Sequence, residues 1–119
     1  MTPHFSKAEL SCRCGCGMLP KEMFMGKVEA LRVKYGKSLT VTSAARCPDH
    51  NAKVSGTGRT GPHTTGRAID LAARGSEALQ IVRMALEMGF TGIGVNQKGP
   101  SRFIHLDDLE DGRPTIWSY

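Results

Sequence analysis

Residues 63–72 constrain the fold most, because they surround one short strand with groups that can bind a metal. Side chains alternate along a strand, so Ile69 and Leu71 face one way and Asp70 faces the other, flanked by alanines. An intervening glycine lets the backbone turn, so that His63 can approach the same carboxylate. The segment therefore predicts a strand with one face in a core and a second, polar face with room for a ligand.

The size and composition indicate one soluble, loop-rich domain that spans residues 1–119. Hydrophobic residues make up 39% of the chain, which excludes a disordered protein. The net charge of +5 favours an anionic partner, such as nucleic acid or the acidic polymers of a cell wall. The basic residues are dispersed, however, so charge alone does not choose between these partners.

Helical and strand patterns are both present along the chain. We expect helices over residues 20–36 and 76–89, and three further strands over residues 38–43, 91–96 and 101–107, the last two forming a hairpin. In the second helix, Leu79, Val82 and Leu86 are expected to line one face, which Ile81, Ala85 and Met88 broaden. The tail, residues 111–119, is expected to be a turn followed by a segment whose aromatic residues fix the C-terminus to the body.

A third metal ligand lies in the last predicted strand. His105 and Asp107 share one face of that strand. His63, Asp70 and His105 lie on strands or strand edges that can adjoin in one sheet. Two imidazoles and a carboxylate are ordinary zinc ligands and leave one position open for water, so the sequence predicts a zinc centre.

Three motifs extend this hypothesis to a family. They are His63-x-x-Gly66-x-Ala68-x-Asp70, Phe103-Ile104-His105-Leu106-Asp107 and the N-terminal run Phe5-Ser6-x-x-Glu9-Leu10-x-Cys12-x-Cys14-Gly15-Cys16-Gly17. Together they resemble the D-alanyl-D-alanine carboxypeptidase family of LAS-type zinc peptidases. Its relatives include phage endolysin peptidases, murein endopeptidases and the Hedgehog signalling domain. The N-terminal run is similar to the small phage and prophage branch.

The resemblance implies a fold, an activity and a set of site residues. The fold is a single α+β domain, with a small, mostly antiparallel sheet and helices packed on one side. The activity is zinc-dependent hydrolysis of peptidoglycan stem or cross-bridge peptides, by carboxypeptidase or endopeptidase action. The zinc ligands are His63, Asp70 and His105, while Arg46 holds the substrate or polarises the scissile carbonyl. We expect a monomer whose partners are peptidoglycan peptides.

The position of the general base departs from the family pattern. Many relatives carry an acid three residues before the last histidine, and here that position is Arg102. We take Asp107 as the substitute, because it lies two residues after His105 on the same strand face, with Asp108 as the next candidate. The alternative role for Asp107 is to orient the imidazole of a zinc ligand.

Two other functions compete with this hypothesis. The first is a non-catalytic zinc module of the same fold, a wall-binding or structural domain, which the missing acid at Arg102 favours. The second is a cysteine-based zinc protein that acts on nucleic acid, suggested by the positive charge. Aromatic residues are few and no helix carries a basic stripe, so nucleic-acid binding is not expected.

The four cysteines leave three states open. Cys12, Cys14 and Cys16 lie within five residues, and the fourth is Cys47. The even number fits two disulfides or one four-thiolate metal site, although the spacing is not the Cys-x-x-Cys of the usual structural zinc site. Reduced cysteines without a metal are the third state.

No targeting or membrane segment is expected. The N-terminus lacks the basic region and apolar run of a secretory signal, and no stretch approaches the roughly 18 apolar residues of a membrane helix. We therefore expect synthesis in the cytoplasm and action on the cell wall after release, as in phage lysis, or a place in a virion. Insertion into a membrane is not expected.

Overall fold

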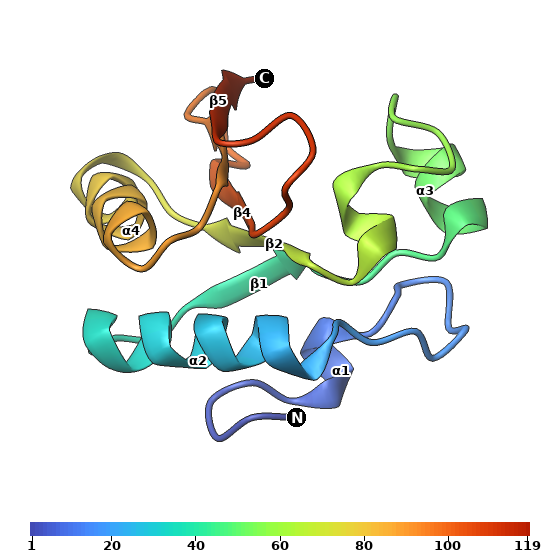
Figure 1. Ribbon diagram of the computed structural model, residues 1–119, viewed down its shortest axis with the longest axis horizontal. Helices are drawn as coiled ribbons and strands as arrows, with labels where there is room; N and C mark the ends of the chain where they lie inside the picture. The colour runs from blue at the N-terminus through green and yellow to red at the C-terminus, as the bar shows by residue number, and fades with distance from the viewer.

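Five short strands form one mixed sheet (Figure 1). The computed structural model describes all residues from Met1 to Tyr119. The strands are β1 (Thr40–Ser43), β2 (Ala68–Ala72), β3 (Gly92–Asn96), β4 (Phe103–Asp107) and β5 (Thr115–Ser118). Their order across the sheet is β1-β2-β4-β3-β5, and every neighbouring pair is antiparallel except β3 with β5.

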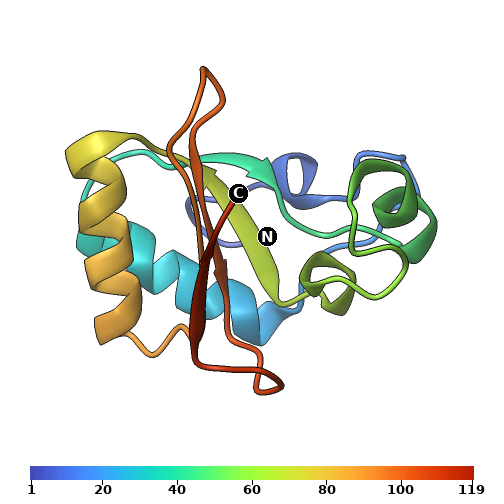
Figure 2. The same cartoon turned by 90° about the horizontal axis from the view of Figure 1, so that it is seen from above.

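Two long helices pack against one face of this sheet. The helices are α1 (Lys7–Leu10), α2 (Glu22–Tyr35), α3 (Pro48–Val54) and α4 (Gly75–Glu87), with a 3-10 helix, η1 (Pro62–Thr65). Figures 1 and 2 show α2 and α4 beside the strands, and α3 with η1 beyond the end of β1. The predicted α+β class, with a mostly antiparallel sheet and helices on one side, is confirmed. None of the helices combines the length and the apolar character that a bilayer crossing requires.

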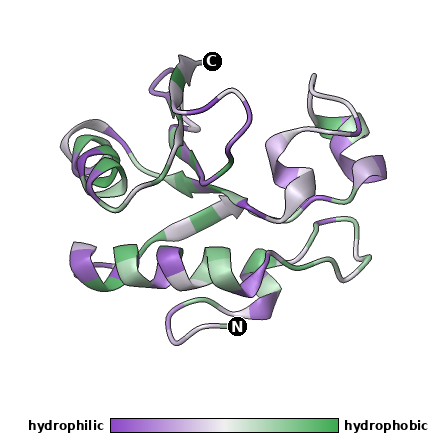
Figure 3. Ribbon diagram, in the orientation of Figure 1, coloured by the Kyte–Doolittle hydropathy of each residue, from purple (hydrophilic) through white to green (hydrophobic).

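The core between the sheet and the two long helices fixes which way the central strands face. Ile69 and Leu71 of β2, with Ile104 and Leu106 of β4, are at most 1% exposed and belong to one buried apolar cluster with α2 and α4. Figure 3 shows the apolar character of these strands. Burying each such side chain stabilises the fold by about 1.5–3 kcal/mol. Because strand residues alternate, the residues between them are directed to the opposite face.

The buried face of α4 differs in part from the one expected from the sequence. Ile81 and Ala85, expected at the margin of that face, are buried together with Ala78, whereas Leu79 and Leu86 are 70% and 60% exposed. The buried residues follow the spacing i, i+3, i+7 of one helix stripe. Their two alanines let the helix approach the sheet closely, so this stripe packs inward and the leucines remain outside.

The C-terminal tail forms a strand where the sequence predicted only a turn and an anchoring segment. β5 pairs in parallel with β3, from Thr115 opposite Gly92 to Ser118 opposite Val95. Its residues are mostly exposed, so they lack the alternation of apolar and polar residues by which a half-buried strand is identified.

Candidate metal centre

A row of aligned residues crosses the sheet on the face opposite the long helices. Asp70 of β2 is in register with His105 of β4, which is in register with Gly94 of β3 and, through it, with Trp117 of β5. A Cβ atom at Gly94 would lie 2.8 Å from Nε1 of Trp117 and 2.9 Å from Cβ of His105. The glycine therefore makes room for the indole, whose ring centroid lies 4.9 Å from that of the imidazole.

His63 reaches this row from η1. Pro62 begins η1, and Gly66 ends it with a left-handed φ of 76°, so the chain reverses just before β2. Nε2 of His63 lies 3.2 Å from Oδ1 of Asp70, and Nδ1 of His105 lies 3.0 Å from the same oxygen. The three ligand atoms lie within 4.8 Å of one another, and all three residues are buried. The structure thus brings together the three residues that the sequence predicted as metal ligands.

In His63 and His105, the ring nitrogen that points away from Asp70 makes a hydrogen bond. That bond determines which nitrogen is protonated and which presents a lone pair to Asp70. The carbonyl oxygen of Ala44 lies 2.6 Å from Nδ1 of His63 and can only accept, so that nitrogen carries a proton. Oδ2 of Asp107 lies 2.8 Å from Nε2 of His105, which is protonated for the same reason. In neutral imidazoles, the two nitrogens that face Asp70 are then acceptors directed at another acceptor. Such an arrangement requires a cation, or additional protons, between the three groups.

The electrostatics of the cluster agree with this need for positive charge. Burial alone would raise the pKa of the Asp70 carboxyl, but the two imidazoles outweigh it and lower that pKa to about 2. Burial alone would lower the pKa of His105, but Asp107 and Asp70 outweigh it and raise that pKa. Protons therefore compete with a metal for the same site, as is usual for metal ligands.

The donor set fits zinc. Two imidazole nitrogens and one carboxylate oxygen are the ligand types and the number that catalytic zinc sites use, and such sites keep a further position for water. The far nitrogen of each imidazole is held by Ala44 or Asp107, which fixes the orientation of the ring as in established zinc sites.

The ligands open onto a cavity of about 540 Å³. Besides the three ligands, its lining includes Arg46, Arg113, residues 54–57, Pro62, Phe103, Trp117 and Tyr119. The glycine-rich loop, residues 55–62, and the C-terminal tail therefore both contribute to its walls. Asp70 is the one carboxylate residue in the lining, and Trp117 and Tyr119 take part in the cavity as well as in fixing the C-terminus.

Arg46 lies beside the ligand cluster. Its Nη2 is 3.6 Å from Oδ2 of Asp70, its Nε donates to Oγ of Ser43 at 3.0 Å, and its Nη1 donates to Oδ1 of Asn51 at 2.9 Å. Asn51 is fully buried and also donates to Oγ1 of Thr57, so it joins Arg46 to the glycine-rich loop. Asn51 could not be identified from the sequence, because an asparagine within a short helix has no distinguishing spacing.

Asp107 lies behind His105 rather than in the cavity. It is fully buried, and its carboxylate accepts hydrogen bonds from Nε2 of His105 and from Nε and Nη2 of Arg113, at 2.9 and 2.7 Å. Burial would raise its pKa, but His105 and Arg113 lower that pKa far below the usual range. A carboxylate so strongly ionised is a weak base. The geometry favours the alternative role of orienting the imidazole, and the assignment of Asp107 as general base stays a prediction.

Two further residues hold Asp107 in this position. A side chain at Gly92 would overlap the carboxylate, so this strand position must be glycine. Arg113 forms the bidentate pair with Asp107 and also lies over the indole of Trp117, 5.1 Å from the ring centroid. The sequence does not indicate a role for Arg113, because its contact with Asp107 depends on how the chain turns back after β4.

The other candidate base, Asp108, and Arg102, which occupies the position of the acid in relatives, both lie away from the cavity. Asp108 pairs with Lys27 at 2.7 Å and with Arg67 at 2.8 Å, and burial, which alone would raise its pKa, is outweighed by these cations. Arg102 donates to the carbonyl of Gly99 in the turn between β3 and β4. Neither residue lines the cavity.

Comparison with known proteins yields one family. A family model described as Peptidase M15 matches residues 3–107, a range that contains the three ligands and Arg46. A search of curated proteins found no match to the chain. The matched range ends before β5, so the indole that contacts His105 lies outside it.

Proposed function

The chain belongs to the peptidase M15 family, and from this premise we propose that it is a zinc peptidase that hydrolyses peptide bonds in peptidoglycan stem or cross-bridge peptides. We propose His63, Asp70 and His105 as the zinc ligands. The observation that carries the proposal is the convergence of two imidazole lone pairs on one carboxylate oxygen at the side of an open cavity. Three acceptors in such contact need a cation or additional protons between them, and two imidazoles with one carboxylate are the donor set of a zinc site.

Zinc bound at this site would supply a Lewis acid for the scissile carbonyl and a water molecule acidic enough to act as a nucleophile near neutral pH. Arg46 would stabilise the negative charge that develops on the carbonyl oxygen. Its guanidinium is already held by Ser43 and Asn51, so it needs little reorganisation during the reaction.

Asp107 and Arg113 act on the site through His105. Asp107 keeps the proton on Nε2, which leaves Nδ1 free to present its lone pair to the cavity. Arg113 keeps Asp107 ionised. In this proposal Asp107 is a positioning residue. The variant Asp107→Asn distinguishes this role from that of a proton acceptor.

The cavity suits a short peptide that carries carboxylates. One wall is aromatic, formed by Phe103, Trp117 and Tyr119, and can contact the apolar parts of a peptide. Arg46 lies beside Asp70 in the same lining and can pair with a carboxylate, and the net charge of +5 attracts the anionic wall polymer. We expect one chain to be sufficient, because all of these residues come from a single chain.

A non-catalytic wall-binding module of the same fold is the second candidate. It is favoured by one observation, that no acidic side chain other than that of Asp70 lines the cavity to accept a proton. Such a module would bind zinc and peptidoglycan without cleaving it.

Digestion of purified peptidoglycan tests the proposal. We expect new free amino groups and smaller muropeptides by mass spectrometry, with neither appearing in the presence of a chelator or with Asp70→Asn. The matched control is Asp49→Asn, which removes an exposed carboxylate that pairs with Arg59, neither residue lining the cavity. Loss of a terminal D-alanine would identify a carboxypeptidase, and separation of cross-linked peptides an endopeptidase. Binding to peptidoglycan without new amino groups would contradict the peptidase proposal and favour the non-catalytic wall-binding module.

A further inference from the structure

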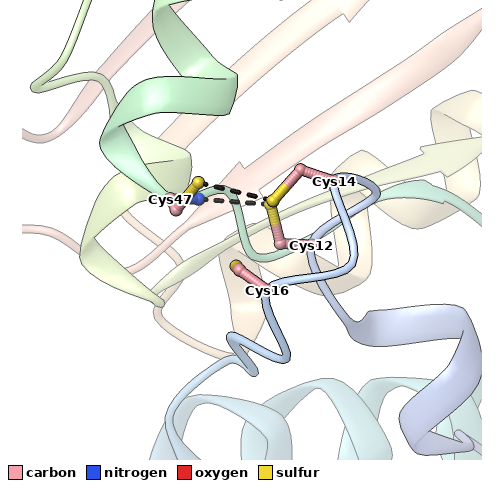
Figure 4. A group of neighbouring side chains, drawn as sticks. All are labelled: Cys12, Cys14, Cys16 and Cys47. Atoms are coloured by element: carbon pink, nitrogen blue, oxygen red, sulfur yellow. Dashed lines mark hydrogen bonds between the residues drawn. The ribbon is translucent and has the colours of Figure 1, made fainter.

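The four cysteines converge at a second place in the fold. Three come from the loop between α1 and α2, and Cys47 comes from the start of α3, yet all four sulfur atoms lie within 4.8 Å of one another. Figure 4 shows the three loop cysteines facing Cys47 across the space between these segments. We propose that Cys12, Cys14, Cys16 and Cys47 form a structural zinc site, separate from the site in the cavity.

The distances between the sulfur atoms match a metal site better than disulfides. Sγ of Cys12 and Sγ of Cys14 are 3.4 Å apart, and Sγ of Cys14 and Sγ of Cys47 are 3.6 Å apart. A tetrahedron with Zn–S bonds of about 2.3 Å has edges of about 3.8 Å. A disulfide needs about 2.05 Å, and the four thiols here converge on one point rather than forming two separate pairs.

The backbone of the loop explains how closely spaced cysteines can face the same point. Gly15, between Cys14 and Cys16, and Gly17, directly after Cys16, have left-handed φ values of 85° and 86°, which curl the chain around the cysteines. The amide of Cys12 donates to the carbonyl of Met18 at 2.9 Å, which closes the loop at its base. Two turns at glycine thus replace the single longer turn of a Cys-x-x-Cys motif.

Backbone amides donate to two of the sulfur atoms. The amide of Cys47 donates to Sγ of Cys12 at 3.3 Å, and the amide of His50 donates to Sγ of Cys47 at 3.4 Å. Such hydrogen bonds stabilise a thiolate, the form of cysteine that binds a metal. They support metal ligation without depending on the ion itself.

Core packing does not account for the cluster. Cys12 is buried, but Cys14 and Cys16 are exposed. Exposed cysteines gain little from the hydrophobic effect, so a loop that gathers three of them beside a fourth needs another stabilising interaction. A shared zinc ion supplies that interaction, because four thiolates are a typical structural ligand set.

The cluster adjoins the segment that carries Arg46. Cys47 follows Arg46 directly and is the N-cap of α3, the helix that bears Asn51. The neighbouring Ala45 donates its amide to the carbonyl of Leu10, so the N-terminal segment already touches this strand end. Zinc in the cluster would therefore fix the position of Arg46 from outside the cavity, as a positioning element rather than as part of the reaction.

Metal analysis of the full chain, purified under anaerobic and reducing conditions, tests the proposal. We expect two zinc ions per chain in the wild type, one in the double variant Cys14→Ser/Cys47→Ser and one in His63→Gln. The matched control is Arg13→Lys, which changes the same loop without removing a thiol and should keep two. A wild type that binds only one zinc ion, with the cysteine variant also binding one, would overturn the proposal, as would iron in the cluster or disulfides in the anaerobic protein.

Cobalt substitution gives a readout independent of peptidase activity. Cobalt bound to thiolates absorbs strongly in the near ultraviolet by charge transfer from sulfur. We expect this band in the wild type and in His63→Gln, and we expect the double cysteine variant to lack it while its circular dichroism remains that of a folded protein. A wild type without the band would overturn the cysteine site, even if the peptidase proposal is correct. If the cysteine variant does not fold, the band in wild type and His63→Gln still decides the question.

Discussion

Replacing Asp107 with asparagine separates the two roles considered for this residue. The carboxylate is fully buried and accepts from His105, from two nitrogens of Arg113 and from the amide of Leu109. Asparagine keeps the shape of the side chain but loses the charge. Its NH2 group is a donor, and it would lie against at least one of these donors. The variant therefore weakens the orientation of His105 and leaves Arg113 without its ionic partner.

The structure gives the size of both effects. Loss of a carboxylate that orients a metal-bound histidine lowers metal affinity by about 10–100-fold, or about 1.4–2.7 kcal/mol. Breaking a buried ion pair costs about 3–5 kcal/mol of folding free energy, and we expect the lower end because Arg113 remains 13% exposed. At saturating zinc, a positioning role predicts that much of the wild-type kcat returns.

Zinc affinity in chelator buffers, kcat at saturating zinc, and urea unfolding are the three measurements. The matched control is Asp108→Asn, the next residue, a mostly buried carboxylate with two cationic partners and no contact with the ligands. It should lose stability but keep the zinc affinity of the wild type. If Asp107→Asn binds zinc as tightly as the wild type while kcat at saturating zinc falls by about 10³-fold or more, Asp107 is the general base and our reasoning is refuted.

Three further predictions follow from the same geometry. Arg46→Lys keeps the charge but cannot make both side-chain hydrogen bonds, so kcat/KM should fall by about 10²-fold, with the zinc content unchanged by metal analysis. Gly94→Ala brings a Cβ within 2.8 Å of a neighbouring indole and should lower the free energy of unfolding in urea by about 1–3 kcal/mol. The control Gly26→Ala, with open space around a helical glycine, should raise that free energy by about 0.5–1 kcal/mol. In metal-free protein, the pKa of His105 is raised above 6.5, so its contribution to stability is lost as pH rises above 6.5 and through the folded-state pKa. The pKa of Asp70 is lowered from 3.8 to about 2, so its contribution is present above pH 3.8 and is lost as pH falls towards about 2. Urea unfolding at several pH values should show both losses, and added zinc should remove the one at higher pH, because the metal then replaces the protons.

The sequence predicted those parts of the site that local patterns determine. Alternation along β2 and β4 directs Asp70 and His105 to one face once Ile69 and Leu106 are in the core, and glycine at position 66 permits the turn from His63. The partners of these ligands depend instead on how the chain returns to them. Arg113 meets Asp107 only after the turn between β4 and β5, and nothing in its neighbouring residues indicates this contact.

Competition between similar patterns explains the error in α4. Its leucines and its alanines both recur at helical spacing, so two stripes could have faced the core. The stripe of Ala78, Ile81 and Ala85 packs inward because its two alanines fit the short distance between helix and sheet. That distance is a property of the assembled fold. β5 was missed for a related reason, since an exposed edge strand has no apolar alternation.

The segment from residue 46 to residue 62 connects the two proposed metal sites. It carries Arg46, Asn51 and the loop that lines the cavity, yet it contributes no residue to the hydrophobic core cluster. Its supports are the cysteine cluster at Cys47, the hydrogen bonds of Asn51 and the ligand His63 that follows it. Removing zinc should therefore increase amide hydrogen exchange in this segment far more than in β2 or β4, whose residues pack in the core. An equal increase of amide hydrogen exchange throughout the chain would contradict this prediction. It would mean that the metals stabilise the whole fold rather than residues 46–62.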